Sequence, residues 1–189
     1  IYLLLVITST FLLPSCSYNT LVSGDETVTK AWADVEASYQ RRADLIGNLV
    51  ETVKGEAKFE KETLTAVIEA RSKATSIQLK ADDITPENMA KFQQAQSQLS
   101  GALSRLLVVA EQYPNLKATQ AFENLMNELE RTENRINVAR RDYNAAVQSY
   151  NTQVRSFPSN IVANVFGFKK REPFKADVGS EKAPKVNFD

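Results

Sequence analysis

Two polar stretches carry the side chains with which this sequence could perform acid–base chemistry. They are QRRADLIGN and ERTENRINVARRDYN, and the residues in question are Arg42, Asp44, Asn48, Glu130, Glu133, Arg140 and Asp142. A carboxylate beside an arginine can take part in proton transfer or hold a charged ligand. Polar side chains at the seam between two helices more often fix the register of those helices. We therefore predict a structural polar network, and we keep open a binding site for a partner helix or a charged ligand.

The composition excludes several classes of enzyme and of binding protein. The sequence has no histidine, which removes histidine acid–base catalysis, Ser-His triads and His-ligated metal sites. It has 23 basic and 23 acidic residues, whereas a nucleic-acid binder would need a basic face. The sequence shows no nucleophile elbow, phosphate loop or metal-ligand cluster. We expect no enzymatic activity, no cofactor, no metal and no nucleic acid, with a carboxylate-based hydrolase as the one catalytic alternative.

The only cysteine, Cys16, follows an apolar run without a charge, residues 1–13. The run is shorter than the roughly 20 apolar residues of a membrane-spanning helix, and it has the length of a signal-peptide core. The stretch LPSC that ends at Cys16 resembles a lipobox, in which the cysteine becomes the lipidated N-terminus. We predict a signal peptide with lipobox over residues 1–15 and a covalent diacylglycerol or acyl lipid on Cys16. A buried structural cysteine stays open, as does an uncleaved anchor extended by residues that we expect to precede Ile1.

Apolar residues recur every three or four positions over four long stretches, which is the spacing of helices that pack on one another. The expected helices cover about residues 28–53, 60–79, 86–113 and 122–157. No stretch alternates with a period of two long enough to indicate a strand. Short connections make successive helices antiparallel neighbours. We predict an all-α, antiparallel up-and-down four-helix bundle with coiled-coil-like packing and with long first and fourth helices.

The unequal helix lengths predict the shape of the bundle. The first and fourth helices should outrun the other two, which predicts a two-helix stalk near the lipid anchor and a four-helix head farther from it. In an antiparallel pair joined at the head, facing residue numbers should sum to about 170 to 176, so Trp32 should meet the turn from Ala139 to Tyr143. The same register places Arg42 opposite Glu130 and Glu133. We predict a bidentate, partly buried ion pair between Arg42 and one of these glutamates.

The segment after the fourth helix, SFPSNIVANVFGFKKREPF, combines aromatic and basic residues. Ser159 or Asn160 could cap a short helix that ends at Gly167. We predict a short membrane-proximal amphipathic segment over residues 159–175. The residues expected at the lipid headgroups are Phe166, Phe168, Lys169, Lys170 and Arg171. The alternative, in which the phenylalanines fold back onto the stalk, stays open. Residues 176–189 are charged and rich in turn formers, which predicts a mobile tail.

Longer blocks of the sequence resemble the LemA family. They run in order from about Tyr18 to Phe174: YNTLVSGDETVTKAWADVEASYQRRADLIGNLVETVKG, EKETLTAVIEARSKA, YPNLKATQAFENLMNELERTENRINVARRDYNAAVQSYN and SFPSNIVANVFGFKKREPF. The resemblance implies a membrane-anchored bacterial protein, exposed outside the cytoplasm, with an antiparallel helical bundle and no established enzymatic activity. Family members usually carry proline at the position of Gly47. Either residue weakens a helix interior, so we expect a bend near residues 45–49.

These features together predict that residues 16–158 form the LemA-like bundle of a non-enzymatic envelope lipoprotein. We expect it to act as a helical scaffold or adaptor for other membrane or periplasmic proteins. Its partners would then be the membrane, through the lipid anchor, and an unidentified envelope protein. Because Ser17 and not an acidic residue follows Cys16, analogy with lipoprotein sorting favours the periplasmic face of the outer membrane. The alternative is a carrier that holds a lipid-like or small ligand in the bundle.

Overall fold

A computed structural model covers the backbone of residues 2–56 and 59–175 and, within these ranges, the side chains from Ser17 onward. The described chain is helical and contains no strand. Its elements are α1 (Tyr2–Lys54), α2 (Lys61–Ser76), the short 3-10 helix η1 (Ala81–Asp83), α3 (Pro86–Ala110), α4 (Pro114–Lys117), α5 (Gln120–Arg155) and α6 (Ser159–Phe166). The predicted signal-peptide side chains, the side chain of Cys16, on which a lipid is predicted, and the predicted tail lie outside the described residues.

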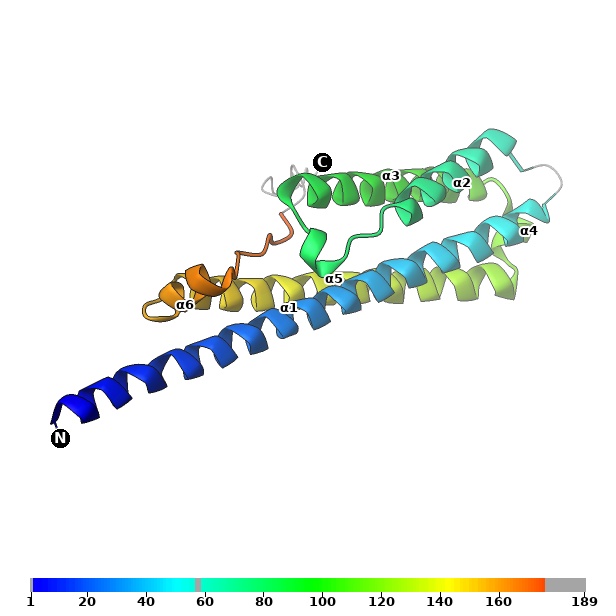
Figure 1. Ribbon diagram of the computed structural model, residues 1–189. Coiled ribbons are helices and arrows are strands. Elements are labelled where there is room, and N and C mark those ends of the chain that lie inside the picture. Colours follow the sequence, from blue (N-terminus) through cyan, green and yellow to red (C-terminus); the bar gives the residue numbers. More distant parts are fainter. Residues whose placement is uncertain (1, 57–58, 176–189) are drawn as a thin grey trace, which may run out of the picture.

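The long helices α1 and α5 lie side by side and antiparallel along most of the molecule (Figure 1). The hairpin of α2 and α3 packs on this pair, and α2 begins and α3 ends at the same end of the pair, which we call the head (Figure 1). At the other end α6 packs against both long helices, and α1 continues past α5 toward the N-terminus (Figure 1). The prediction of an all-α antiparallel bundle with two long and two shorter main helices is confirmed.

Apolar side chains fill the space between these helices in two main cores. The head core joins α1, α2, α3 and the first half of α5. The second core lies nearer the N-terminus of α1 and includes the buried rings of Trp32 and Tyr143. A third, smaller cluster joins α1 to α6 through Leu21 and Val162. The three clusters follow one another along the α1–α5 pair, so other elements pack against this pair from Leu21 to Val53 of α1.

Trp32 shows how the second core departs from the predicted two-helix stalk. Its ring meets Tyr143 edge-on with centroids 5.3 Å apart, which confirms the predicted register of α1 and α5. The ring also contacts Phe92 of α3 and Phe174, at 5.7 and 5.8 Å. The indole Nε1 donates a hydrogen bond to the Leu79 carbonyl at 2.6 Å. α3 and the C-terminal segment thus cover the region expected to be a bare stalk, and the stalk prediction is wrong at Trp32.

The hairpin reaches Trp32 because its tip, residues 77–85, is largely extended rather than helical. The sequence predicted a helix until about Leu79, but α2 ends at Ser76 and Leu79 turns into the second core, where it is 7% exposed. Burial of an apolar side chain outweighs helix propensity here. α3 then starts after Thr85, whose Oγ1 accepts a hydrogen bond from the Asn88 N–H at 3.1 Å.

Candidate functional site

The structure places the seven residues of the predicted polar network in different surroundings. Asn48 and Glu130 are exposed on the surfaces of α1 and α5. The other five divide between the pair of the buried Arg42 with Glu133, a contact between α1 and α2 at Asp44, an outer groove that contains Asp142, and the C-terminal segment, where Arg140 Nη2 donates to the Lys175 carbonyl at 3.4 Å. The seven residues therefore do not form one continuous network, and each place has its own chemistry.

Arg42 is the buried member of the set, with 6% of its side chain exposed. Its Nη1 donates to Glu133 Oε2 at 3.2 Å and to Ser100 Oγ at 3.3 Å. Its Nη2 donates to Gln96 Oε1 at 2.5 Å, and the guanidinium lies 5.0 Å from the ring centroid of Tyr39. The expected pair with Glu133 is present, but it uses one carboxylate oxygen rather than two, and the Glu133 side chain is 52% exposed. The bidentate geometry is therefore corrected.

Gln96 explains why the ion pair is not bidentate. This glutamine of α3 is 8% exposed, and its amide oxygen accepts a hydrogen bond from Arg42 Nη2. Only Nη1 of the guanidinium then binds the carboxylate of Glu133. The sequence could have indicated a buried role for Gln96. This residue falls between Phe92 and Leu99 at the seam spacing of α3, where an apolar residue is expected. A buried arginine that meets partners from two other helices can fix the register of all three. We expect that role for the Arg42 cluster.

Asp44 and Gly47 face Arg71 of α2. Arg71 Nη2 lies 3.8 Å from Asp44 Oδ1, and Arg71 Nε donates to the Ala43 carbonyl at 2.7 Å. A Cβ added at Gly47 would lie 3.2 Å from the guanidinium carbon. In a helix the Ala43 carbonyl accepts from the N–H four residues later, which a proline there would lack. Arg71 thus gives this carbonyl a second donor at the position for which the sequence resemblance implies proline.

Replacing Gly47 by proline is expected to lower the free energy of unfolding by about 1 kcal/mol, well below the roughly 3 kcal/mol typical of a helix interior. The Arg71 donor remains for the Ala43 carbonyl, and the flexible guanidinium can move aside. In an Arg71→Ala background the same change should cost about 3 kcal/mol. Urea unfolding measures these chains, with Gly47→Ala as the control that keeps the N–H. An equal cost in both backgrounds would refute this role of Arg71.

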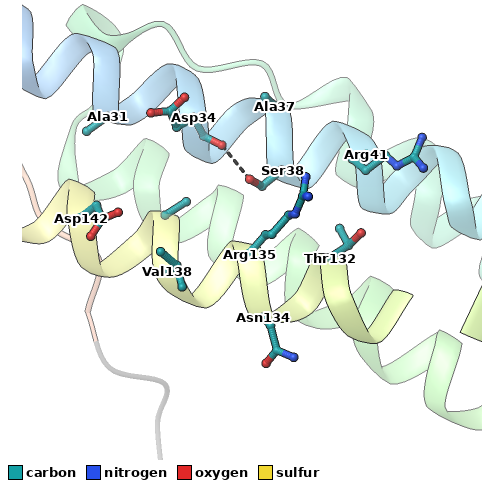
Figure 2. Close-up of a pocket in the computed structure, with 11 residues that line it drawn as sticks. Ala31, Asp34, Ala37, Ser38, Arg41, Thr132, Asn134, Arg135, Val138 and Asp142 are labelled. Atoms are coloured by element: carbon teal, nitrogen blue, oxygen red, sulfur yellow. Dashed lines mark hydrogen bonds between the residues drawn. The ribbon is translucent and has the colours of Figure 1, made fainter. Parts of the chain in front are cut away.

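An open groove of about 510 Å³ is lined by α1 and α5 alone (Figure 2). Small and apolar side chains, such as Ala31 and Val138, form part of its wall. Its charged lining residues are all exposed: Asp34, Arg41, Arg135 and Asp142. Figure 2 shows the two aspartates toward one end and the Arg41 side chain toward the other. No hydrogen-bonded nucleophile and base face each other among these described residues, so the groove suits docking better than catalysis.

The start and end of α6 test the predicted C-terminal helix. α6 ends at Gly167, whose φ of 77° is left-handed, as the sequence predicted. It begins after Pro158 without a side-chain cap, so the predicted capping by Ser159 or Asn160 is wrong. Both residues lie inside the first turn instead, where the Asn160 N–H donates to the Ser156 carbonyl at 2.8 Å. A side chain within the turn cannot occupy the capping position that precedes it.

The predicted membrane-proximal residues occupy two environments. Phe166 is 61% exposed, and Lys169 and Lys170 are exposed as well, while Phe168 is partly buried. Arg171 differs, because only 14% of its side chain is exposed. Three of the five residues thus lie at the surface near α6, Phe168 packs against the cluster that joins α1 to α6, and Arg171 belongs to the bundle.

Arg171 joins the C-terminal segment to α1 and η1. Its Nη2 donates to Asp25 Oδ1 and to Asp82 Oδ1, both at 2.8 Å. Its Nη1 donates to the Ala81 carbonyl at 2.8 Å. The prediction that Arg171 reaches lipid headgroups is wrong, because two carboxylates from different elements already neutralise its charge.

Two buried tyrosines lie beside this cluster. Tyr143 Oη donates to the Glu172 carbonyl at 2.8 Å. Burial raises the pKa of Tyr143 to about 12, and burial followed by the nearby Asp25 carboxylate raises the pKa of Tyr150 to about 12. Both phenols therefore stay protonated near neutral pH, where they donate hydrogen bonds and cannot act as bases.

Metal clusters and membrane spans are both absent from the described residues. Between residues 17 and 175, apart from 57 and 58, no three acidic or cysteine side chains are placed to bind a metal ion. Over the same part of the chain, no helix has an apolar stretch long enough to cross a membrane.

Comparisons with known proteins agree on one family. The LemA family model matches residues 31–188. The chain is similar to the magnetosome proteins MamQ 2 and MamQ 1 of Paramagnetospirillum magneticum, with 29% identity over 176 residues that cover 84% of this chain and 64% of each relative. It is also similar to Protein LemA of Metamycoplasma hominis, with 26% identity over 166 residues that cover 85% of this chain and 72% of that protein. The chain thus spans slightly less than two thirds of the magnetosome relatives. Since the family model takes in α2 to α6 and half of α1, the protein belongs to the LemA family.

Proposed function

We propose that this LemA family protein is a non-enzymatic, membrane-anchored envelope lipoprotein whose helical bundle serves as a scaffold or adaptor for other membrane or periplasmic proteins. The observation that carries the proposal is an exposed apolar surface at the end of the bundle nearest Cys16. We call it the α6 surface, and its side chains are 79, 55, 73 and 61% exposed in the order Phe157, Ile161, Val165 and Phe166.

The packing of α6 directs these side chains to solvent. The opposite face of α6 buries Val162 against Leu21 of α1. The ring of Tyr18, two residues after Cys16, meets the Phe166 ring with centroids 4.9 Å apart. Contiguous exposed apolar side chains usually mark contact with a membrane or another protein. Here they lie beside the residue expected to carry the lipid, which favours a membrane.

A second membrane signal strengthens a lipid anchor. Stable attachment takes two signals, such as two acyl chains or one chain with a basic patch, and each further signal adds to the binding. The exposed Lys169 and Lys170 follow α6, and each lysine near an anionic surface adds about 1 kcal/mol of attraction. With this end on the membrane, α5 carries the head away from it over a helix about 50 Å long.

The outer side of the α1–α5 pair supports the adaptor role. α2 and α3 leave the groove there uncovered, so a helix or loop of a partner has access to it. The two cores fill the space between the main helices, so a carrier of a lipid-like ligand would need to use a surface hollow such as this groove. As part of the same proposal we place the protein on the periplasmic face of the outer membrane. Crosslinking from a photoreactive residue at Val138 in intact cells tests the adaptor role, and failure to capture any recurrent envelope protein would count against it.

Changing Cys16 to serine is expected to remove most of the protein, but not all, from the membrane fraction of cells. On this background, changing Phe157, Ile161 and Val165 to serine should release the remainder, because both membrane signals are then absent. Fractionation with immunoblotting measures the membrane-bound share of each variant relative to its total amount in the cells. Val108→Ser is the matched control, since Val108 is 69% exposed but lies on α3 in the head.

Full retention of the Cys16→Ser chain with the three α6 changes would contradict this mode of attachment. It would indicate that the apolar run before Cys16 remains in place as the anchor. Release of the Val108→Ser chain would show that any lost apolar side chain has the same effect, which would remove the argument from the α6 surface.

A further inference from the structure

After α6 the chain runs back along the bundle as an extended segment, residues 167–175, which we call the strap (Figure 1). It leaves α6 at Gly167, where no heavy atom lies within 4 Å of an added Cβ. From there it passes toward the N-terminal end of α3 (Figure 1). Side chains from α1, η1, α3 and α5 hold the strap, and we call this set of side chains the slot.

Two asparagines of α5 hold the main chain of the strap in the same way. Asn151 Nδ2 donates to the Arg171 carbonyl, and Asn151 Oδ1 accepts from the Arg171 N–H, both at 2.8 Å. Asn144 binds Phe174 likewise, at 3.2 Å to the carbonyl and 2.8 Å from the N–H. Seven residues of helix span about 10.5 Å and three extended residues about 10 Å, so the spacing of the two amides matches the strap.

Further side chains continue this contact with the main chain of the strap. Tyr143 Oη donates to the Glu172 carbonyl at 2.8 Å, and Gln93 Nε2 donates to the Lys175 carbonyl at 3.1 Å. These bonds do not depend on which side chains the strap carries. Proteins recognise extended peptides by this combination of main-chain hydrogen bonds with pockets for a few side chains.

Two side chains of the strap occupy such pockets. Phe174 is 5% exposed in a cage of three aromatic rings, one of which is Trp32 at 5.8 Å. Arg171 donates to Asp25 and Asp82, each at 2.8 Å. The slot therefore selects an arginine and, three residues later, a phenylalanine.

We propose that the slot is a recognition site for an extended Arg-x-x-Phe segment, and that the strap of a second copy of this chain can occupy it in place of the chain's own. A second copy supplies the same two side chains at the same spacing, and only the link at Gly167 favours the chain's own strap. Such a link acts as an effective concentration on the order of millimolar. Copies that are anchored on one membrane reach a local concentration near this value, and this step rests on the function proposed above. Exchange of identical elements between copies is a low-cost route to dimers.

Trp32 is the only tryptophan and reports whether the slot is occupied, because Phe174 lies against its ring. The full-length Phe174→Ala chain should bind a peptide of the strap sequence GFKKREPFK. As peptide is added, the Trp32 fluorescence emission should change until it reaches that of the unmodified chain and then stay constant. Peptides that carry the Phe174→Ala or the Arg171→Ala change should bind about tenfold more weakly, or worse. The unmodified chain, whose slot is filled, should also need about tenfold more peptide.

Mixing two full-length chains tests the second copy as the occupant. The donor carries Trp32→Phe and an intact strap, and the acceptor carries Phe174→Ala and keeps Trp32. We expect the Trp32 emission of the acceptor to shift as donor is added, and a mixed dimer to appear in size-exclusion chromatography with light scattering. A donor with both Trp32→Phe and Phe174→Ala is the matched control and should give neither change.

Each outcome decides part of the proposal. An acceptor that is folded by circular dichroism and binds no peptide overturns the recognition site, and an Arg171→Ala acceptor replaces Phe174→Ala if the latter does not fold. Peptide binding without exchange between copies overturns the second copy as the occupant. Both measurements are made in solution without a membrane, so their failure leaves the proposed anchoring intact.

Discussion

Replacing Trp32 by alanine is expected to lower the free energy of unfolding by about 4 kcal/mol. The change removes a ring that is 1% exposed and that three other aromatic rings contact, one of them in the strap. It also removes the donor to the Leu79 carbonyl, and an unpaired buried carbonyl adds to the cost. Urea unfolding followed by far-ultraviolet circular dichroism measures the loss.

Trp32→Phe separates the packing of the ring from its hydrogen bond. We expect this chain to lose about 2 kcal/mol, because a smaller ring remains in the cage while the Leu79 carbonyl loses its donor. A loss below about 1 kcal/mol for Trp32→Ala would contradict the closed packing of the second core. The two chains together show how much of the stability of this core depends on the tip of the hairpin.

Replacing Arg42 by alanine is expected to cost about 3 kcal/mol, whereas replacing Glu133 by alanine should cost about 1 kcal/mol or less. The difference follows from burial, since the side chains of Arg42 and Glu133 are 6% and 52% exposed. Loss of the guanidinium leaves the buried Gln96 Oε1 without this donor. Loss of the Glu133 carboxylate leaves Arg42 its contacts with Gln96 and Ser100.

Double-mutant cycles distinguish the two partners of Arg42. Coupling with Gln96 should exceed coupling with Glu133, and Arg42→Met with Gln96→Leu should recover most of the loss, because well-packed apolar side chains can replace a buried polar pair. Stronger coupling with Glu133 would show that the ion pair, and not the amide contact, fixes the register. Absence of coupling with either partner would leave Arg42 without a structural role, and a site for an external ligand would then explain it better.

The main helices and the register of α1 and α5 could be predicted from the sequence. Their apolar residues recur with the helical period over several turns, so local spacing alone identifies them. An antiparallel pair joined at one end has a single free parameter, the sum of facing residue numbers. That sum predicted the contact of Trp32 with the turn that ends at Tyr143 and the approach of Arg42 to Glu133, both of which the structure shows.

The hairpin tip and the strap could not be predicted in this way. Residues 77–85 and 167–175 have no periodicity, and their positions depend on partners far away in the sequence. Arg171 follows two lysines and therefore resembles part of a basic surface. In the structure its side chain instead packs in the bundle, where it donates to the carboxylates of Asp25 and Asp82. Nothing local to either aspartate indicates that they meet.

The attachment of the α2–α3 hairpin has a mechanical consequence. α2 begins and α3 ends at the head, beside the end of α1 and the start of α5 (Figure 1). At the opposite end the tip of the hairpin is fastened by the bond from Trp32 to Leu79 and by the bonds from Arg171 to η1. The hairpin is thus a cantilever with its hinge at the head. A contact at the tip acts through the longest lever arm, so these few bonds resist an outward swing with more torque than equal bonds near the hinge.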